Sequence, residues 1–302
     1  MRPHVAFVGL GIMGAPMAGQ LLEAGYPLAV FNRTAAKAEP LRARGARVAS
    51  SVADCVRDAD VVLTMLPDTP DVVAVLDGPE GAIAKAKPRA VLLDMSTISP
   101  VATKRLAEQA ASRGLGYVDA PVSGGQKGAQ DATLSIMVGG SDADVARVRP
   151  ILEKLGKTIT HLGPVGNGQV AKACNQIVVG VTIQALAEAF VLGKKAGLDP
   201  AALARVLAGG LARCGVLETR GPRILADDYA PGFRVRLHHK DLTVALETAA
   251  ANGVPLPATA LVREQMRTLI ARGEGDLDHT ALVRVIEQWA GAMVGSREQS
   301  PG

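Results

Sequence analysis

The chain has 302 residues, enough for two domains that each bury a core of their own. With 48% hydrophobic residues, 21% charged residues and 33 glycines, the composition is typical of a globular protein and excludes a disordered one. The formal net charge is +4, but the basic residues are scattered and form no run interleaved with aromatic residues. We therefore expect a small-molecule partner and no nucleic acid.

Short apolar, β-rich runs alternate with helical patterns in the first half of the chain. The strands are expected at residues 5–10, 28–32, 60–66, 90–96, 116–122, 133–140 and 157–163. Helices are expected at 13–24, 34–44 and 100–113, the last with Ser99 as N-cap and Pro100 as first helical residue, and another begins at Ser141. This alternation predicts a mostly parallel sheet covered by helices on both faces.

From Gly166 onward only helical patterns are found. The boundary near 163–166 divides the chain into an α/β domain, residues 1–164, and an all-helical domain, residues 165–302. The apolar run 177–193 contains Gln184 and Glu188, so a buried helix explains it better than a membrane span.

The cysteines and the N-terminus bear on the cellular compartment. Three widely spaced cysteines, Cys55, Cys174 and Cys214, indicate a reducing compartment and no disulfide framework. The four residues before the first strand are too few for a signal peptide. We expect a soluble cytoplasmic protein without a membrane partner.

A glycine-rich motif lies between the first strand and the first helix, in "VAFVGLGIMGAPMA" (5–18). Gly9 permits a tight turn, Gly11 lets a pyrophosphate approach the backbone, and Gly14 lets the helix pack on the strand. The following helix N-terminus supplies amide groups and a positive dipole end. The motif predicts a Rossmann-type dinucleotide-binding domain, with a purely structural tight turn as the alternative. The expected contacts are Gly9, Leu10, Gly11, Ile12, Met13 and Gly14.

The second strand ends with Asn32, Arg33 and Thr34. An NAD-preferring enzyme typically has an acidic residue there, which accepts a hydrogen bond from the ribose 2′-hydroxyl. A guanidinium beside two neutral polar side chains suits a 2′-phosphate instead, so we expect NADP (NADPH), with NAD as a further possibility. The alternative is that Arg33 is a solvated surface residue.

Two further strand ends carry residues that could contact the dinucleotide. Leu66-Pro67 and Ser96-Thr97 fall at the carboxyl edge of the sheet, where open α/β folds bind ligands. Alternatively, Ser96 or Ser99 only caps the next helix.

Ser123, Gly124 and Gly125 form a candidate carboxylate site. They expose consecutive backbone amides beside a hydroxyl. A flexible hairpin loop is the alternative.

Lys172, Asn175 and Gln176 lie at the start of a helix that then becomes nearly all apolar. Their spacing places the three polar side chains near one helix face. They are either aimed at a ligand or are the solvated end of a buried helix, with Lys172 extending to solvent.

Four motifs in order, "VGLGIMGAPMA", "DAPVSGG", "GNGQVAKACNQ" and "HHKDL", resemble the β-hydroxyacid dehydrogenases over essentially the whole chain. The resemblance implies a Rossmann-type domain, then an all-α domain joined by a long interdomain helix, with the active site between them. It also implies that Ser123, Gly124 and Gly125 hold the substrate carboxylate, that Lys172 is catalytic, and that Lys240 reaches the cofactor.

Within this family, Gln176 preceded by Asn175, together with the block 209–242, looks most like the tartronate semialdehyde reductases. One departure is that Cys214 and Gly215 stand where Ser and Thr are expected, which implies the loss of a substrate-side hydrogen bond. We expect reduction of a short carboxylate-bearing aldehyde, with Lys172 as general acid. Alternatives are a 3-hydroxyisobutyrate dehydrogenase, a glyoxylate or succinic semialdehyde reductase, or a non-catalytic NADPH-binding protein.

Three remaining expectations concern metal, thiol and assembly. His238 and His239 point about 100° apart on a helix and no third ligand has metal-binding spacing, so no metal site is expected. Cys174 has no histidine at helical spacing, so a small packing residue is expected rather than a nucleophile. The Ala/Leu-rich helical half and the resemblance favour a homodimer or homotetramer.

Overall fold

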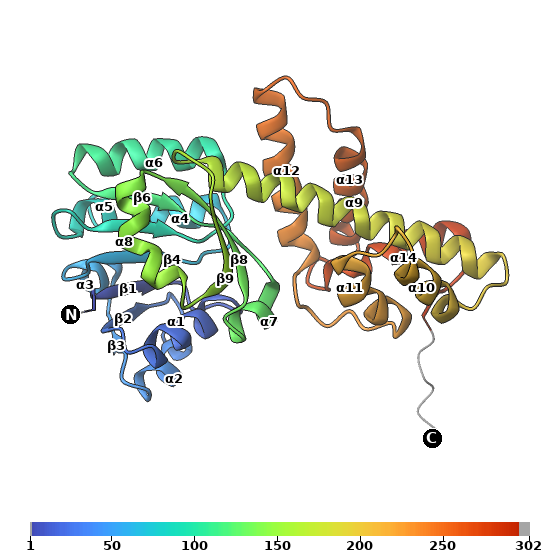
Figure 1. Ribbon diagram of the computed structural model, residues 1–302, viewed down its shortest axis with the longest axis horizontal. Coiled ribbons are helices and arrows are strands. Elements are labelled where there is room, and N and C mark those ends of the chain that lie inside the picture. The colour runs from blue at the N-terminus through green and yellow to red at the C-terminus, as the bar shows by residue number, and fades with distance from the viewer. Residues whose placement is uncertain (1, 296–302) are drawn as a thin grey trace. The chain divides into compact units, whose positions relative to one another are not determined.

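The computed structural model describes residues 2–295 and divides into two compact units, Met1–Lys172 and Ala173–Gly302 (Figure 1). We call them the N-terminal and C-terminal units and describe each by itself.

The N-terminal unit is built on a nine-stranded sheet of order β3-β2-β1-β4-β5-β6-β8-β7, with β9 beside β8. The first six strands are parallel, in the order typical of dinucleotide-binding folds, as the alternating pattern predicted. The strands are β1 Val5–Val8, β2 Leu28–Phe31, β3 Arg47–Val48, β4 Val61–Thr64, β5 Val91–Asp94, β6 Gly116–Asp119, β7 Val122–Ser123, β8 Leu134–Gly140 and β9 Gly156–His161.

The far edge of the sheet departs from the parallel arrangement. β8 is antiparallel to both β6 and β7, and β9 is parallel to β8. Residues 124–133 connect β7 to β8, and this stretch is shorter than the dozen or so residues that a parallel crossover needs. The short connection therefore favours the antiparallel pairing of β7 with β8.

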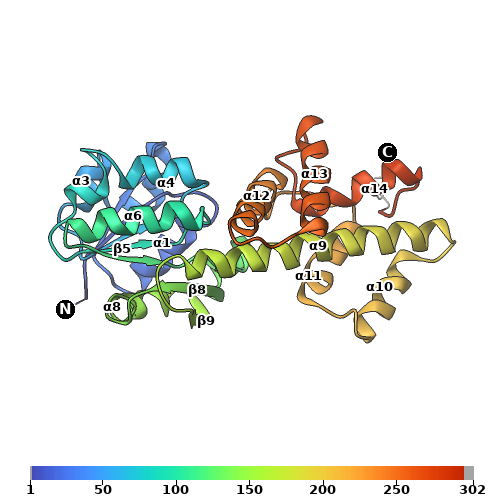
Figure 2. The same ribbon diagram turned by 90° about the horizontal axis from the view of Figure 1, so that it is seen from above.

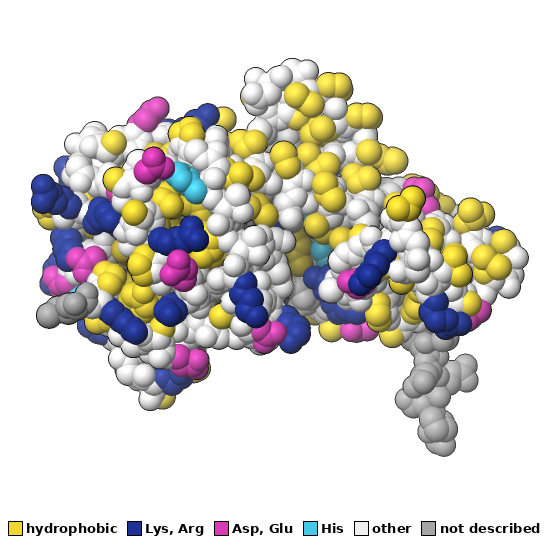
Figure 3. All heavy atoms as spheres, in the orientation of Figure 1, with side chains coloured by type: hydrophobic (Ala, Val, Ile, Leu, Met, Phe, Trp, Pro, Cys, Tyr) yellow, Lys and Arg dark blue, Asp and Glu magenta, His cyan; other side chains and the backbone are white. Residues whose placement is uncertain are grey.

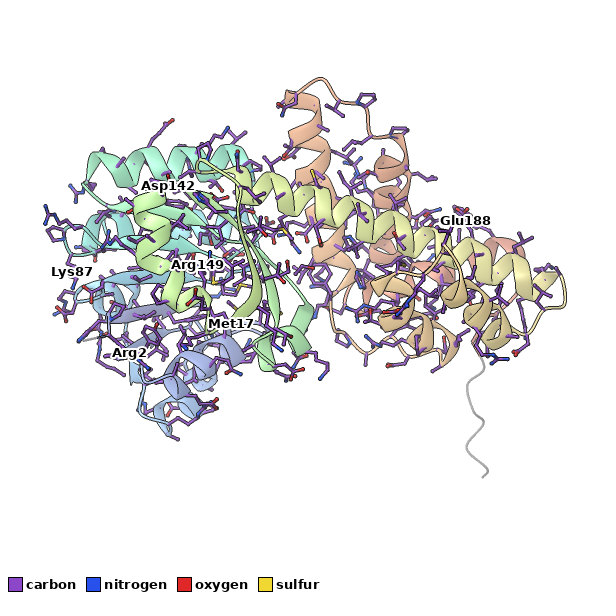
Figure 4. All side chains as sticks on the ribbon, in the orientation of Figure 1. Arg2, Met17, Lys87, Asp142, Arg149 and Glu188 are labelled. Carbon is purple, nitrogen blue, oxygen red and sulfur yellow. The ribbon has the colours of Figure 1, made fainter. Side chains whose placement is uncertain are left out.

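Helices cover both faces of the sheet. Alternate β1 residues belong to opposite cores: Phe7 lies in a core that also contains residues of α1 and α8, whereas Val8 lies in one that contains residues of α3, α4 and α6. Figure 2 shows α3, α4 and α6 on one side of the sheet and α8 on the other. Met17 of α1, labelled in Figure 4, is fully buried in the first core. The helices are α1 Gly14–Glu23, η1 Ala35–Ala38, α2 Glu39–Arg42, α3 Val52–Val56, α4 Thr69–Leu76, α5 Ala82–Lys85, α6 Pro100–Ser112, α7 Gly125–Gln130 and α8 Asp142–Leu152.

Local sequence explains how several of these helices begin. Ser141 caps α8, because its side chain accepts a hydrogen bond from the amide of Asp144. Ser99 is the N-cap of α6 and Pro100 its first helical residue, as expected, although the Ser99 side chain makes no capping hydrogen bond. The helix expected at 34–44 is instead a 3₁₀ turn followed by α2, since Pro40 has no amide hydrogen to continue the ladder.

Up to residue 295 the C-terminal unit has helices and no strand, as predicted, and its core contains Ile183, Phe190, Leu242 and Met266. Its helices are α9 Asn167–Lys195, which begins in the N-terminal unit, α10 Pro200–Gly209, α11 Gly215–Leu225, α12 Val235–Ala251, α13 Pro257–Ala271, η2 His279–Leu282 and α14 Val283–Ala290. Helix α9 is long and apolar enough to cross a membrane, a criterion that the core helices of soluble proteins also meet. Half of its most apolar 18-residue segment is buried within the protein.

Asp278 fixes the loop that precedes α12. Its Oδ2 accepts hydrogen bonds of 2.9 Å from the amides of Gly232 and Phe233 and lies 3.1 Å from Nη1 of Arg223. Its Oδ1 accepts from the hydroxyl and amide of Thr280. Because Asp278 is fully buried, these donors replace the water that its charge would otherwise require.

Candidate active site

The glycine-rich loop between β1 and α1 has one open position and two packed ones. Gly9 has φ of +103°, and a Cβ there would collide with the carbonyl oxygen of Met65. A Cβ on Gly14 would collide with the carbonyl oxygen of Gly9. No atom lies within 4 Å of a Cβ built on Gly11, so there the backbone is open to a ligand. Leu10 is buried and Ile12 is exposed. Met13, the N-cap of α1, makes no side-chain capping bond. Because the amides at a helix N-terminus bind anions, the loop fits a dinucleotide pyrophosphate.

Asn32 at the end of β2 is bonded to the protein through both ends of its amide. Its Oδ1 accepts a 2.9 Å hydrogen bond from the amide of Leu10, and its Nδ2 donates to the carbonyl of Thr34. Asn32 thus holds the glycine-rich loop, a role that the sequence analysis missed. Arg33 and Thr34 follow it and are exposed.

Side chains at the ends of β4 and β5 form a buried network. The Ser96 hydroxyl accepts a hydrogen bond of 2.9 Å from the amide of Leu66. Asp94 accepts from the Thr64 hydroxyl at 2.7 Å and from the amide of Ser96 at 3.1 Å. Ser96 is fully buried and joins two strand ends, and it does not cap α6. Exposed Pro67 and half-buried Thr97 follow these strand ends.

Asp119 joins the end of β6 to the start of α9. Its carboxylate accepts hydrogen bonds from the amides of Gly166, at 2.7 Å, and Gln169, at 2.9 Å. Burial raises the pKa of Asp119 to about 6, while these two bonds oppose the shift. The side chain of Gln169 in turn bonds the backbone of Ser96 and Ile98. The sequence analysis missed Asp119, although its place at a strand end beside the carboxylate motif was a signal.

The candidate carboxylate site is more ordered than a loop. Ser123 ends β7, Gly124 is the N-cap of α7 and Gly125 its first residue, so a helix, and not only a loop, connects the antiparallel strands β7 and β8. The two glycines have φ of +135° and +61°, conformations that L side chains rarely adopt. No side chain forms a capping hydrogen bond at the start of α7, and half-buried Ser123 directly precedes its N-cap residue, Gly124.

Lys172, Asn175 and Gln176 lie near the start of α9. Lys172 is buried, at 6% exposure, which contradicts a lysine that extends to solvent. Asn175 Nδ2 donates to Gln176 Oε1 at 2.8 Å, and Gln176 Nε2 donates to Asp241 Oδ2 at 2.6 Å. The amide of Gln176 is therefore fixed on both sides.

Lys240 lies on α12 beside Asp241. Its Nζ is 2.9 Å from Asp241 Oδ1, so one buried carboxylate serves both Lys240 and Gln176. The sequence analysis identified the lysine and the amide but missed the carboxylate that holds them. An acid directly after a candidate lysine was the available signal.

The cysteine expectations are partly corrected. Cys174 is exposed, so the prediction of a packing residue is wrong. Cys214 is the N-cap of α11, and its Sγ accepts from the amide of Leu217 at 3.4 Å, so this departure from the family pattern falls at a helix cap. Among residues 2–295, no cluster of three or more His, Cys, Asp or Glu side chains could hold a metal ion.

Two family matches account for most of the chain. Residues 4–163 match the NAD-binding domain of 6-phosphogluconate dehydrogenase, and residues 166–286 match the NAD-binding domain of NADP-dependent 3-hydroxyisobutyrate dehydrogenase. These matches agree with the open glycine-rich loop in assigning a nicotinamide dinucleotide to the protein.

Individual relatives are similar over nearly their full length. The 2-hydroxy-3-oxopropionate reductase of Escherichia coli (strain K12) is 43% identical, covering 95% of this chain and 98% of that protein. A 3-hydroxyisobutyrate dehydrogenase of Pseudomonas aeruginosa is 40% identical, covering 92% and 95%. The structure of Mycobacterium tuberculosis 3-hydroxyisobutyrate dehydrogenase with L-serine has a TM-score of 0.87 and 37% identity, covering 95% and 99%. The chain belongs to the 3-hydroxyisobutyrate dehydrogenase-like family of NAD(P)-dependent hydroxyacid dehydrogenases.

Proposed function

We propose that this protein is an NADPH-dependent reductase that converts tartronate semialdehyde to glycerate. The observation that carries the proposal is the buried ammonium of Lys172 one turn before the fixed amides of Asn175 and Gln176 on α9. The E. coli reductase, 43% identical, supports this choice of aldehyde among short carboxylate-bearing substrates.

Each group has a defined task in this reaction. The nicotinamide, when bound, supplies the hydride that adds to the aldehyde carbon. Lys172 Nζ donates a proton to the carbonyl oxygen as negative charge develops there, and solvent restores the proton to the amine. Ser123 and the amides of Gly124 and Gly125 bind the substrate carboxylate. Asn175 and Gln176 orient the substrate, and Lys240 contacts the cofactor.

We propose NADPH as the preferred cofactor. Arg33 and Thr34 are exposed after the end of β2, and the residues that flank them in the chain, Asn32 and Ala35, are not acidic, which suits a 2′-phosphate. NAD remains the competing cofactor. The other proposed dinucleotide contacts are Gly9, Leu10, Gly11, Ile12, Met13, Gly14, Asn32, Leu66, Pro67, Ser96 and Thr97.

A second candidate function is 3-hydroxyisobutyrate dehydrogenase. It is favoured by the match of residues 166–286 and by the 40% identical P. aeruginosa enzyme. We would compare kcat/KM for tartronate semialdehyde, succinic semialdehyde, glyoxylate and 3-hydroxyisobutyrate on one enzyme preparation. The highest value with tartronate semialdehyde is expected, and a higher value with 3-hydroxyisobutyrate would replace the first candidate by the second.

We further propose a cytoplasmic homodimer or homotetramer. Three free cysteines support a reducing compartment. Apolar side chains are exposed on the C-terminal unit, as the face in Figure 3 shows. The exposed apolar residues include Val178 and Leu192 of α9 and Leu261 of α13. Pro255 and Leu256 line an apolar groove with Val178. Light scattering tests the oligomeric state, and a monomer would exclude both the dimer and the tetramer. Cell fractionation tests the cytoplasmic location.

A further inference from the structure

Two buried histidines of the C-terminal unit share a hydrogen bond. Nδ1 of His238, on α12, lies 2.9 Å from Nδ1 of His279, in η2, and the side chains are 0% and 3% exposed. Nε2 of His238 lies 3.2 Å from the backbone carbonyl oxygen of Gln176. The ring of Phe233 packs on both imidazoles, with centroids 5.7 and 5.4 Å away.

The partners determine which nitrogens carry hydrogen. The carbonyl of Gln176 can only accept, so Nε2 of His238 must be the donor there. A neutral His238 then has a lone pair at Nδ1, and the hydrogen between the two Nδ1 atoms belongs to His279. The hydrogen bonds therefore run from His279 to His238 to Gln176. This direction is the same whether or not Nε2 of His279, 3.9 Å from Asp278 Oδ1, gains a second proton.

A glycine makes the contact with α9 possible. A Cβ built on Gly180 would lie 3.2 Å from Nε2 and 3.3 Å from Cε1 of His238, closer than nearly all such contacts. Gly180 is one turn after Gln176, so its missing side chain leaves room for the imidazole to reach the carbonyl.

Helix α12 holds Gln176 at two points. His238 and Asp241 are three residues apart on one face of α12. His238 binds the backbone carbonyl of Gln176, and Asp241 binds its side-chain amide at 2.6 Å. Two contacts on one residue restrict both the position of the helical turn and the rotamer of the side chain.

We infer that His279 is a positioning residue that acts through His238 to fix Gln176 for substrate binding. The inference rests on the proposed function, in which Gln176 contacts the substrate. His279 locks the His238 tautomer that donates to Gln176, because a His238 protonated at Nδ1 would turn a lone pair toward the carbonyl.

The hydrogen-bond chain can be tested without activity. In the intact protein labelled with ¹⁵N-histidine, NMR should show His238 protonated at Nε2, His279 protonated at Nδ1, and a scalar coupling between the two Nδ1 nuclei. A His238 protonated at Nδ1, or a mobile pair without coupling, would overturn the inference. This measurement holds even if none of the four acids tested above is a substrate, an outcome that would reject only the proposed function.

The positioning role is tested by three variants. His279→Leu removes the donor, whereas His279→Asn keeps an N–H near the Nδ1 position. His279→Leu should raise the KM for tartronate semialdehyde roughly three- to tenfold, with smaller changes in kcat and in the KM for NADPH, and His279→Asn should restore most of the loss. His239→Gln, next to His238 on the same helix, is the control and should leave all three constants unchanged. Equal effects of Leu and Asn, or an unchanged KM in His279→Leu, would contradict the role.

Discussion

The side-chain oxygen of Asn32, at the end of β2, accepts a hydrogen bond from the backbone amide of Leu10 in the glycine-rich loop. Loss of this bond in Asn32→Ala should weaken NADPH and NADH binding alike, by about fivefold each, because the loop contacts the pyrophosphate that both cofactors share. Dissociation constants from nicotinamide fluorescence give the two numbers.

The substitution Arg33→Ala, at the next residue, should affect NADPH but not NADH. Loss of one charge-assisted contact with the 2′-phosphate should weaken NADPH binding about ten- to a hundredfold and leave NADH nearly unchanged. If both cofactors weaken equally, Arg33 is a surface residue and the proposed NADPH preference loses its support.

Two glycines of the same loop should separate binding from stability. Gly11→Ala adds a methyl group in open space, so the free energy of unfolding should change by less than about 0.5 kcal/mol while dinucleotide binding weakens at least roughly tenfold. Gly14→Ala pushes a methyl group into the Gly9 carbonyl and should cost about 3 kcal/mol or more. Urea unfolding and cofactor titration measure both effects, and a stable Gly14→Ala protein would contradict the packing argument.

Ser123→Ala tests the carboxylate site. It removes the hydroxyl next to the first amides of α7, so the KM for the aldehyde acid should rise by about five- to tenfold. NADPH affinity should remain nearly normal. Steady-state kinetics with each substrate varied in turn distinguishes these effects, and a defect confined to NADPH would place the carboxylate elsewhere.

Lys172→Ala tests the general acid. The variant should lower kcat by about 10²–10⁴-fold with little change in NADPH binding, the usual contribution of a positioned proton donor. Lys172→Arg should recover little activity, since a guanidinium does not release its proton at working pH. A near-normal kcat in Lys172→Ala would exclude the mechanism.

The carboxyl of Asp119 should make stability depend on pH. Its pKa in the folded protein is about 6, above the ordinary value of 3.8, so the folded state binds this proton more tightly than the unfolded chain does. The protonated carboxyl therefore stabilises the folded state relative to the ionised carboxyl. This contribution to the free energy of unfolding is fully present below about pH 4 and is lost as the pH rises through about 6. A difference of about two pH units corresponds to at most about 3 kcal/mol.

Urea unfolding of Asp119→Asn and the parent protein at a series of pH values tests this sign. The difference in unfolding free energy between the two should change between about pH 4 and pH 6 and be constant above. Asp54→Asn is a control with the opposite pH dependence. Hydrogen bonds from Ser50 and Arg47 lower the pKa of Asp54, so the stability that this carboxylate contributes is lost as the pH falls. Parallel curves for Asp119→Asn and the parent protein would contradict the assignment.

Features set by neighbouring residues could be predicted from the sequence. Short apolar runs alternating with helical patterns predicted the parallel strands, and the spacing of Gly9, Gly11 and Gly14 predicted one open and two packed positions. The antiparallel pairing of β8 was not predicted, because an apolar run indicates a strand but not the direction in which that strand pairs.

Contacts between distant residues could not be predicted in the same way. The Asp119–Gly166 bond spans 47 residues and the His238–His279 bond spans 41, and no local pattern links their members. Lys240 was identified from its motif, yet the partner that fixes Gln176 from 65 residues away, Asp241, was visible only once α12 was packed against α9.

The buried carboxylate of Asp278 also has a consequence for the dynamics of the loop before α12. The amides of Gly232, Phe233 and Thr280 all donate to it, although the first two are 46 and 45 residues away from it in the chain. A fluctuation that withdraws the carboxylate releases all three at once, so their hydrogen–deuterium exchange rates should rise and fall together. The loop that carries Phe233 and the start of η2 should then open together, as one cooperative unit.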